Sequence, residues 1–158
     1  MTTTHPTLGE ARLPRNPLLS EVLELVSKQK TKAKKIQTLK QYESLHLKSV
    51  LIWNFDDSVQ SMLPDGEVPF KKNDAPAGTE HLHLAYEWKK LYNFVKGGND
   101  ILRPMKREQL FMQLLEGLHP DEAEIICLVK DKNLKKKYKL TRAVVEEAFP
   151  DIQWGNRS

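Results

Sequence analysis

Apolar residues recur every three or four positions along most of the chain, which is the spacing that gathers them on one face of an α-helix. These apolar stripes predict helices over residues 18–26, 33–42, 45–55, 79–95, 104–117, 119–129 and 141–149. No stretch shows sustained alternation of apolar and polar residues, and no Asn-Gly hairpin signal or internal repeat occurs. We therefore expect an all-α fold, with a single compact domain of about six or seven helices.

Residues with known positional preferences mark the ends of the last three predicted helices. Pro104 and Pro120 stand at first helical positions, where the fixed φ of proline suits the helix. Gly117 ends the helix that begins at Pro104. Thr141 can cap the last helix through its hydroxyl, and Pro150 ends that helix.

The pattern divides the chain into an arm, a domain and a tail. Residues 1–16 contain few large apolar groups and predict a flexible N-terminal arm, and residues 151–158 predict a C-terminal tail. Residues 17–150 form the helical domain, in which three prolines and two glycines predict a long loop over residues 63–78. Apolar residues of the loop and tail are candidates for packing on the domain, namely Leu63, Val68, Phe70, Ile152 and Trp154.

Basic residues are concentrated in two segments, although the net charge of the whole chain is only +4. Residues 28–40 carry six lysines and no acidic residue, and residues 130–142 carry seven basic residues and one acidic residue, Asp131. Such clusters repel themselves unless an anion lies against them, and they are typical of polyanion binders. They are equally compatible with two solvated helix faces.

The residue types that catalysis needs do not converge in the sequence. His81 and His83 are two positions apart, whereas a zinc-binding pair on a helix is four apart. Asp56-Asp57 has no histidine or nucleophile nearby, and no phosphate-binding glycine loop or dinucleotide fingerprint occurs. We expect a non-enzymatic protein without catalytic residues, metal or cofactor.

The single cysteine, Cys127, lies between Ile126 and Leu128 and is expected in the core. One cysteine excludes an intramolecular disulfide, which fits a reducing cytoplasm. No stretch approaches the roughly 18 continuous apolar residues of a membrane span. The first residues lack the basic start and apolar run of a secretory signal, so no membrane association is expected.

Lysine side chains neutralise phosphates, and the free backbone amides at a helix start beside Lys139 and Arg142 suit an anion. Tyr138, inside the second lysine segment, either stacks on a base or anchors the segment to the core. We favour anchoring, because aromatic side chains are usually held by packing. The expected DNA-contacting residues are Lys28, Lys32, Lys35, Lys130, Lys132, Lys135, Lys136, Lys137, Lys139, Thr141 and Arg142.

Several motifs resemble a family of small, largely uncharacterised proteins of tailed bacteriophages, including those of marine cyanobacteria. The motifs are KREQLFMQLLEGLHPDEA (106–123), LPDGE (63–67), LT (140–141) and EAFP (147–150). The resemblance extends from about residue 18 to residue 152 and implies a phage protein that acts in the host cytoplasm.

A second pattern resembles the end of the helical DNA-binding domain that precedes the catalytic core of phage and other ATP-dependent DNA ligases. It consists of an apolar helix, LVKD (128–131) with a basic connection, and LT (140–141) leading to AFP (148–150). The resemblance implies a helical module that grips duplex DNA through backbone and minor-groove contacts. At the matching positions, Lys130, Lys132 and the helix start at Thr141 would face the DNA.

The chain departs from the ligase pattern in two places. Its only Asp-Gly pair, Asp65-Gly66, has Leu63 where a nucleotidyltransferase motif has lysine, which excludes ligation by this chain. The glycine usual before the final helix is replaced around Tyr138-Lys139, so the backbone approach to DNA differs.

We therefore expect a non-enzymatic phage protein that binds nucleic acid, preferably duplex DNA, with little sequence preference, in phage replication, repair or transcription. The alternative is an adaptor or inhibitor that docks on a host or phage protein through the arm, the loop or the tail. A virion component is a third possibility that the sequence does not separate from these.

Overall fold

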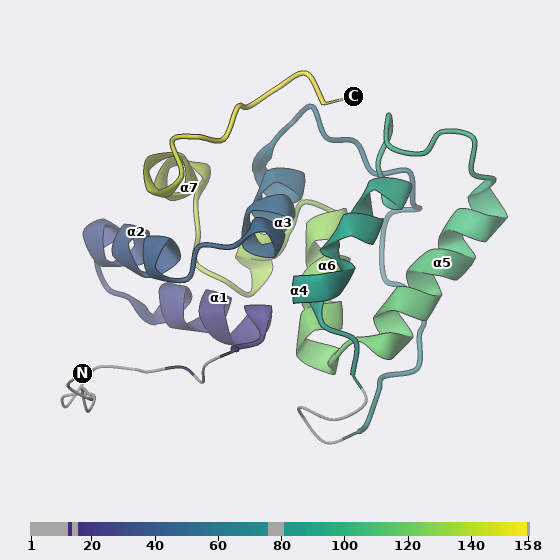
Figure 1. The fold of residues 1–158 in the computed structure, drawn as a ribbon, viewed down its shortest axis with the longest axis horizontal. Helices are drawn as coiled ribbons and strands as arrows, with labels where there is room; N and C mark the ends of the chain where they lie inside the picture. Colours follow the sequence, from purple (N-terminus) through teal and green to yellow (C-terminus); the bar gives the residue numbers. More distant parts are fainter. Residues whose placement is uncertain (1–12, 14–15, 76–80, 158) are drawn as a thin grey trace.

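The structure, a computed structural model, describes residues 13, 16–75 and 81–157. These residues form seven α-helices and two short 3-10 helices and contain no strand (Figure 1), so the all-α prediction is confirmed. The α-helices are α1 (Leu19–Lys28), α2 (Lys32–Gln41), α3 (Leu45–Phe55), α4 (Leu84–Glu87), α5 (Pro104–Gly117), α6 (Pro120–Lys130) and α7 (Arg142–Ala148). The 3-10 helices are η1 (Trp88–Phe94) and η2 (Leu134–Lys136).

The helices pack around one hydrophobic core, with α3 and α6 in the middle of the molecule (Figure 1). Helix α1 packs on α2 and on the central α6, and α7 packs on α2. Helices α1, α2 and α7 therefore form one side of the molecule. Helix α5 and the α4–η1 segment form the other side and contact α6 and α3, respectively. Helices α2 and α7 therefore lie together although they come from opposite ends of the domain.

Short polar side chains cap three of the helices at their N-termini. The hydroxyls of Thr31, Ser44 and Thr141 accept hydrogen bonds from the N–H groups of Lys34 (3.2 Å), Leu47 (3.2 Å) and Val144 (3.4 Å). Each cap satisfies an amide that has no partner within its helix. The prediction that Thr141 caps the last helix is confirmed.

The predicted helix over residues 79–95 is wrong in its extent and type. Residues 79 and 80 lie outside the described residues, and residues 81–83 are extended, because the N–H of Leu82 donates to the carbonyl of Gly117 (2.7 Å). Only one α-helical turn follows before the chain tightens into η1. The guanidinium of Arg107, only 2% exposed, then binds the carbonyls of Asn93, Asn99 and Leu102 at 2.9–3.0 Å.

The described part of the long loop and of the tail lies on the domain. Leu63 is buried, and Val68 and Phe70 pack against the core. In the tail, Ile152 is 9% exposed and Trp154 packs on the core beside it. The apolar residues that the sequence marked as packing candidates therefore all contact the domain.

Candidate nucleic-acid interface

The two lysine segments meet where α2 packs against the chain that leads into α7. The Nζ of Lys35 donates to the backbone carbonyl of Lys139 (2.5 Å), and the N–H of Lys139 donates to the hydroxyl of Ser27 (2.9 Å). Farther along, the Nζ of Lys32 reaches Glu147 of α7 (2.7 Å). We call this region, residues 28–40 together with residues 134–142, the basic seam.

Three of the predicted contact lysines form ion pairs at the surface. Lys28 pairs with Glu24 (3.1 Å), Lys32 with Glu147 (2.7 Å), and Lys137 with Glu124. These lysine side chains remain 70%, 52% and 46% exposed. Exposed pairs of this kind contribute about 0–1 kcal/mol, so a phosphate can replace the carboxylate at little cost.

Lys130 is a buried structural residue that does not face solvent. It is 2% exposed, and its Nζ donates to the carbonyls of Pro64 (2.7 Å) and Gly66 (3.0 Å) and to Asp131 (2.7 Å). The other oxygen of Asp131 accepts from the N–H of Gly66 (3.3 Å). The expectation that Lys130 contacts DNA is therefore corrected, because its ammonium group holds the loop against α6.

Lys132 also points inward. Its Nζ donates to the carbonyls of Trp53 (2.7 Å) and Asp56 (2.8 Å), at the end of α3, where a positive charge suits the helix dipole. Partial burial lowers the pKa of Lys132 from its usual value. Lys132 adopts a left-handed backbone conformation (φ 54°), which turns the chain from α6 toward η2. Like Lys130, Lys132 is therefore not available to contact DNA, contrary to the expectation from the sequence.

Thr141 and Arg142 have their own internal partners. The hydroxyl of Thr141 is used in capping α7, which is only seven residues long. The guanidinium of Arg142 stacks on the ring of Trp154, 4.6 Å from its centroid, and lies 3.6 Å from Glu146. Arg142 thus links α7 to the tail while its side chain remains 40% exposed, and the hydroxyl of Thr141 is engaged in the cap.

Lys135, Lys136 and Lys139 are exposed, and no carboxylate of the described residues lies within ion-pair distance of their ammonium groups. The same holds for Lys30, Lys34 and Lys40, which belong to the first lysine segment but not to the expected DNA contacts. The concentration of lysines in residues 28–40 is the sequence feature that could have identified these three residues. Together with Lys35, whose Nζ donates to a neutral carbonyl, these six side chains carry the charge of the basic seam that no carboxylate neutralises.

Tyr138 anchors the second lysine segment. Its side chain is 3% exposed within the core, and burial raises the pKa of its hydroxyl to about 12. The ring is therefore not available to stack on a base, and the anchoring interpretation is confirmed. Because Tyr138 is fixed inward, the flanking lysines 137 and 139 are held at the surface.

The described residues contain no group of three metal-ligating side chains, and no helix among them is long and apolar enough to cross a membrane. Cys127 packs against the core, and burial raises the pKa of its thiol to about 11. A reactive cysteine has a lowered pKa, so Cys127 lacks the properties of a nucleophile.

Comparison with known proteins gives a family but no function. No curated protein and no solved structure matches the chain. One family model, described as a family of unknown function (DUF6433), matches residues 22–136, from α1 through η2. The chain therefore belongs to the DUF6433 family.

Proposed function

We propose that this protein binds duplex DNA non-catalytically, through contacts between the basic seam and the phosphate backbone. The observation that carries the proposal is the contact between Lys35 and Lys139, which joins two lysine segments about a hundred positions apart into one surface. Backbone contacts position a protein on DNA without reading its sequence, so little sequence preference is expected.

The proposed contacts are the surface lysines of the predicted set: Lys28, Lys32, Lys35, Lys135, Lys136, Lys137 and Lys139. Those with carboxylate partners exchange them for phosphates, those without partners gain one, and Lys35 adds a phosphate beside its contact with the carbonyl of Lys139. Binding releases condensed counterions from the DNA, which favours association most strongly at low salt. The ion pairs already present reduce this gain but leave an excess of positive charge along the seam.

The resemblance to the helical domain of ATP-dependent ligases supports duplex DNA as the partner, since that domain also uses a basic connection between two helices. The resemblance to phage proteins supports a role in phage replication, repair or transcription in the host cytoplasm. The internal roles of Lys130 and Lys132 mean that the DNA would lie along α2 and residues 135–139.

A second function, docking on a host or phage protein, is favoured by a different surface. Ile101, three residues before α5, and Met105, its second residue, are 94% and 83% exposed. Large apolar side chains with such exposure are typical of protein contacts when they lie together. The experiment below separates the two functions.

The test compares two triple charge reversals that change net charge equally. In one variant Lys135, Lys136 and Lys139 become glutamate, and in the control the exposed Lys71, Lys72 and Lys106, outside the seam, become glutamate. Fluorescence anisotropy with a short labelled duplex should show affinity falling about a hundredfold or more in the seam variant and only a few-fold in the control. Circular dichroism checks that both variants keep their helical content.

Equal affinity in the two variants, or no duplex binding by the parent protein at low salt, would contradict the proposal. Pull-down from infected cells with nuclease treatment would then report on the protein-docking function, because partners held through nucleic acid are lost on digestion.

A further inference from the structure

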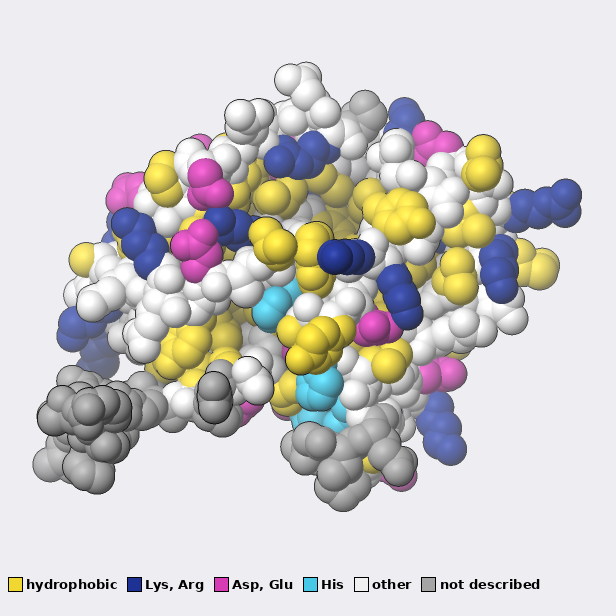
Figure 2. All heavy atoms as spheres, in the orientation of Figure 1, with side chains coloured by type: hydrophobic (Ala, Val, Ile, Leu, Met, Phe, Trp, Pro, Cys, Tyr) yellow, Lys and Arg dark blue, Asp and Glu magenta, His cyan; other side chains and the backbone are white. Residues whose placement is uncertain are grey.

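A cavity of about 360 Å³ lies between α3 and η1, and no residue of the basic seam lines it. In Figure 2, hydrophobic side chains line a hollow in the middle of the visible face, and basic side chains lie along its edge. We call this cavity the Trp pocket and define it by Ser49, Trp53, Trp88, Lys89, Tyr92 and Lys96. Arg157, four aliphatic side chains and two glycines complete its lining. Its volume falls within the range of small-molecule sites.

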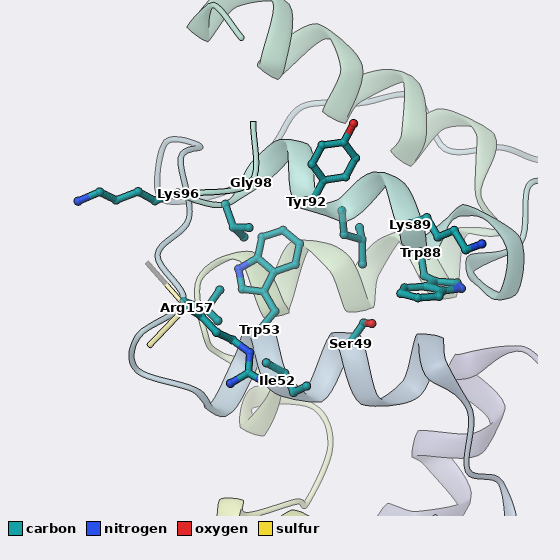
Figure 3. Close-up of a pocket in the computed structure, with 13 residues that line it drawn as sticks. Ser49, Ile52, Trp53, Trp88, Lys89, Tyr92, Lys96, Gly98 and Arg157 are labelled. Atoms are coloured by element: carbon teal, nitrogen blue, oxygen red, sulfur yellow. The ribbon is translucent and has the colours of Figure 1, made fainter. Parts of the chain in front are cut away.

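Three aromatic rings from two elements border the pocket. Trp53 comes from α3, and Trp88 and Tyr92 come from η1, with the hydroxyl of Ser49 directed between the two tryptophans (Figure 3). Tyr92 is 52% exposed, so an incoming planar group can reach its ring. Aromatic walls of this kind favour a flat, polarisable ligand over an aliphatic one.

The indole of Trp53 has an unused hydrogen-bond donor. The residue is 3% exposed, and its Nε1–H has no acceptor among the described residues. In Figure 3 this nitrogen is directed toward the side of the pocket where Lys96 and Arg157 lie. A buried N–H without a partner is uncommon in folded proteins, and this one is covered by its neighbours, so an acceptor atom of a ligand satisfies it only if the indole shifts toward the pocket.

The charge around the pocket has one sign. Lys89, Lys96 and Arg157 line it, and no carboxylate does. Lys89 lies 6.0 Å from the centroid of the Trp88 ring, so its ammonium group sits beside the aromatic wall. Arg157 is held by Asp56 (2.7 Å) and keeps further N–H donors for a ligand. The ligand should therefore carry a negative charge.

We propose that the Trp pocket binds a nucleotide, with the base against the rings of Trp88 and Tyr92 and the phosphate at Lys89 beside them, while Lys96, at the opposite end of the pocket in Figure 3, adds positive charge. Every base offers a flat face for stacking and acceptor atoms for the indole N–H, and its phosphate matches the lysines. The chemistry is shared by a free nucleotide and by the terminal nucleotide of a single strand, and the experiment separates these sources. The proposal does not depend on duplex binding at the basic seam.

Intrinsic tryptophan fluorescence of the intact protein provides the test. Titration with adenosine 5′-monophosphate should quench the fluorescence saturably, whereas adenosine and inorganic phosphate alone should bind at least about tenfold more weakly. A 5′-phosphorylated single strand that binds more tightly than the mononucleotide would identify a strand end as the ligand, and the reverse order would identify the free nucleotide.

Two variants locate the site. Replacing Lys89 and Lys96 by glutamate should weaken mononucleotide binding about tenfold or more, while the equally charged reversal of Lys71 and Lys72 should leave it unchanged. Trp88→Ala, at a half-buried position, should also weaken binding while helical content is kept. The seam variant of Lys135, Lys136 and Lys139 should bind the mononucleotide normally, which distinguishes this proposal from duplex binding.

Absence of saturable quenching, or equal losses in the Lys89/Lys96 variant and its Lys71/Lys72 control, would overturn the assignment. Equal binding of adenosine and adenosine 5′-monophosphate would also overturn it, because the lysines would then contribute nothing to recognition.

Discussion

A single buried carboxylate joins three helix N-termini. Glu122, 2% exposed in the first turn of α6, accepts hydrogen bonds from the N–H of Leu19 (2.8 Å) and of Leu84 (3.1 Å). These amides begin α1 and α4, so the negative charge lies near the positive ends of three helix dipoles. Glu122 therefore fixes the relative positions of segments that come from three parts of the chain.

Glu122→Gln should lower the free energy of unfolding by about 2 kcal/mol, because the amide loses the charge and turns an NH₂ donor toward a backbone N–H. Urea denaturation measures this, with Glu108→Gln on the exposed face of α5 as the control. If both variants unfold at the same urea concentration, the three-helix junction does not depend on this carboxylate.

Asp56 holds the tail at the end of α3. Its carboxylate, 2% exposed, accepts from the N–H (2.9 Å) and hydroxyl (2.7 Å) of Ser58, the N–H of Gly155 (3.0 Å) and the guanidinium of Arg157 (2.7 Å). Burial alone would raise the pKa of Asp56, but the hydrogen bonds lower it from 3.8 to about 2.

Because the folded-state pKa of Asp56 is below its ordinary value, its stabilisation is complete above about pH 5 and is lost as the pH falls from about 4 toward 2. Asp56→Asn should cost about 2 kcal/mol of unfolding free energy at pH 7 and much less near pH 2. Thermal unfolding across this range tests the effect, and Asp57→Asn, whose side chain is 97% exposed, is the control. A loss that does not vary with pH would contradict the role of the ionised carboxylate.

At the scale of elements, Lys130 connects the end of α6 to the loop. Lys130→Met keeps the length of the side chain but leaves the carbonyls of Pro64 and Gly66 without their donor. We expect a loss of about 2 kcal/mol or more in unfolding free energy, compared with almost none for Lys136→Met at the exposed end of η2. Chemical denaturation measures the difference. Equal effects of the two substitutions would mean that the buried ammonium group is not needed to hold the loop.

The sequence predicts the regular helices well because their apolar spacing and end residues agree. Pro104, Pro120 and Thr141 mark helix starts that the structure contains. The segment 81–95 was predicted less well, because apolar residues every three or four positions fit an α-helix and a 3-10 helix alike. Its form depends on Gly117 and Arg107, which bind it from other parts of the chain.

At the scale of the whole molecule, the sequence locates the charge clusters but does not show which charges face inward. Lys130 and Lys135 belong to one lysine run, yet Lys130 is buried because it binds the carbonyl of Pro64. That acceptor lies 66 positions earlier in the chain, so the local sequence does not reveal the contact. The meeting of Lys35 and Lys139 likewise requires α2 and α7 to pack together. The Trp pocket was not predicted at all, since Trp53 and Trp88 carry no signal that they share a cavity.

The salt dependence of duplex binding tests the basic seam most directly. If the seven surface lysines contact phosphates, the logarithm of the association constant should fall against the logarithm of salt concentration with a slope of about −6. Reversal of Lys135, Lys136 and Lys139 should make that slope shallower by about three, while the reversal of Lys71, Lys72 and Lys106 leaves it unchanged. A slope near zero, or one that the seam variant and its control alter equally, would contradict DNA binding through the seam.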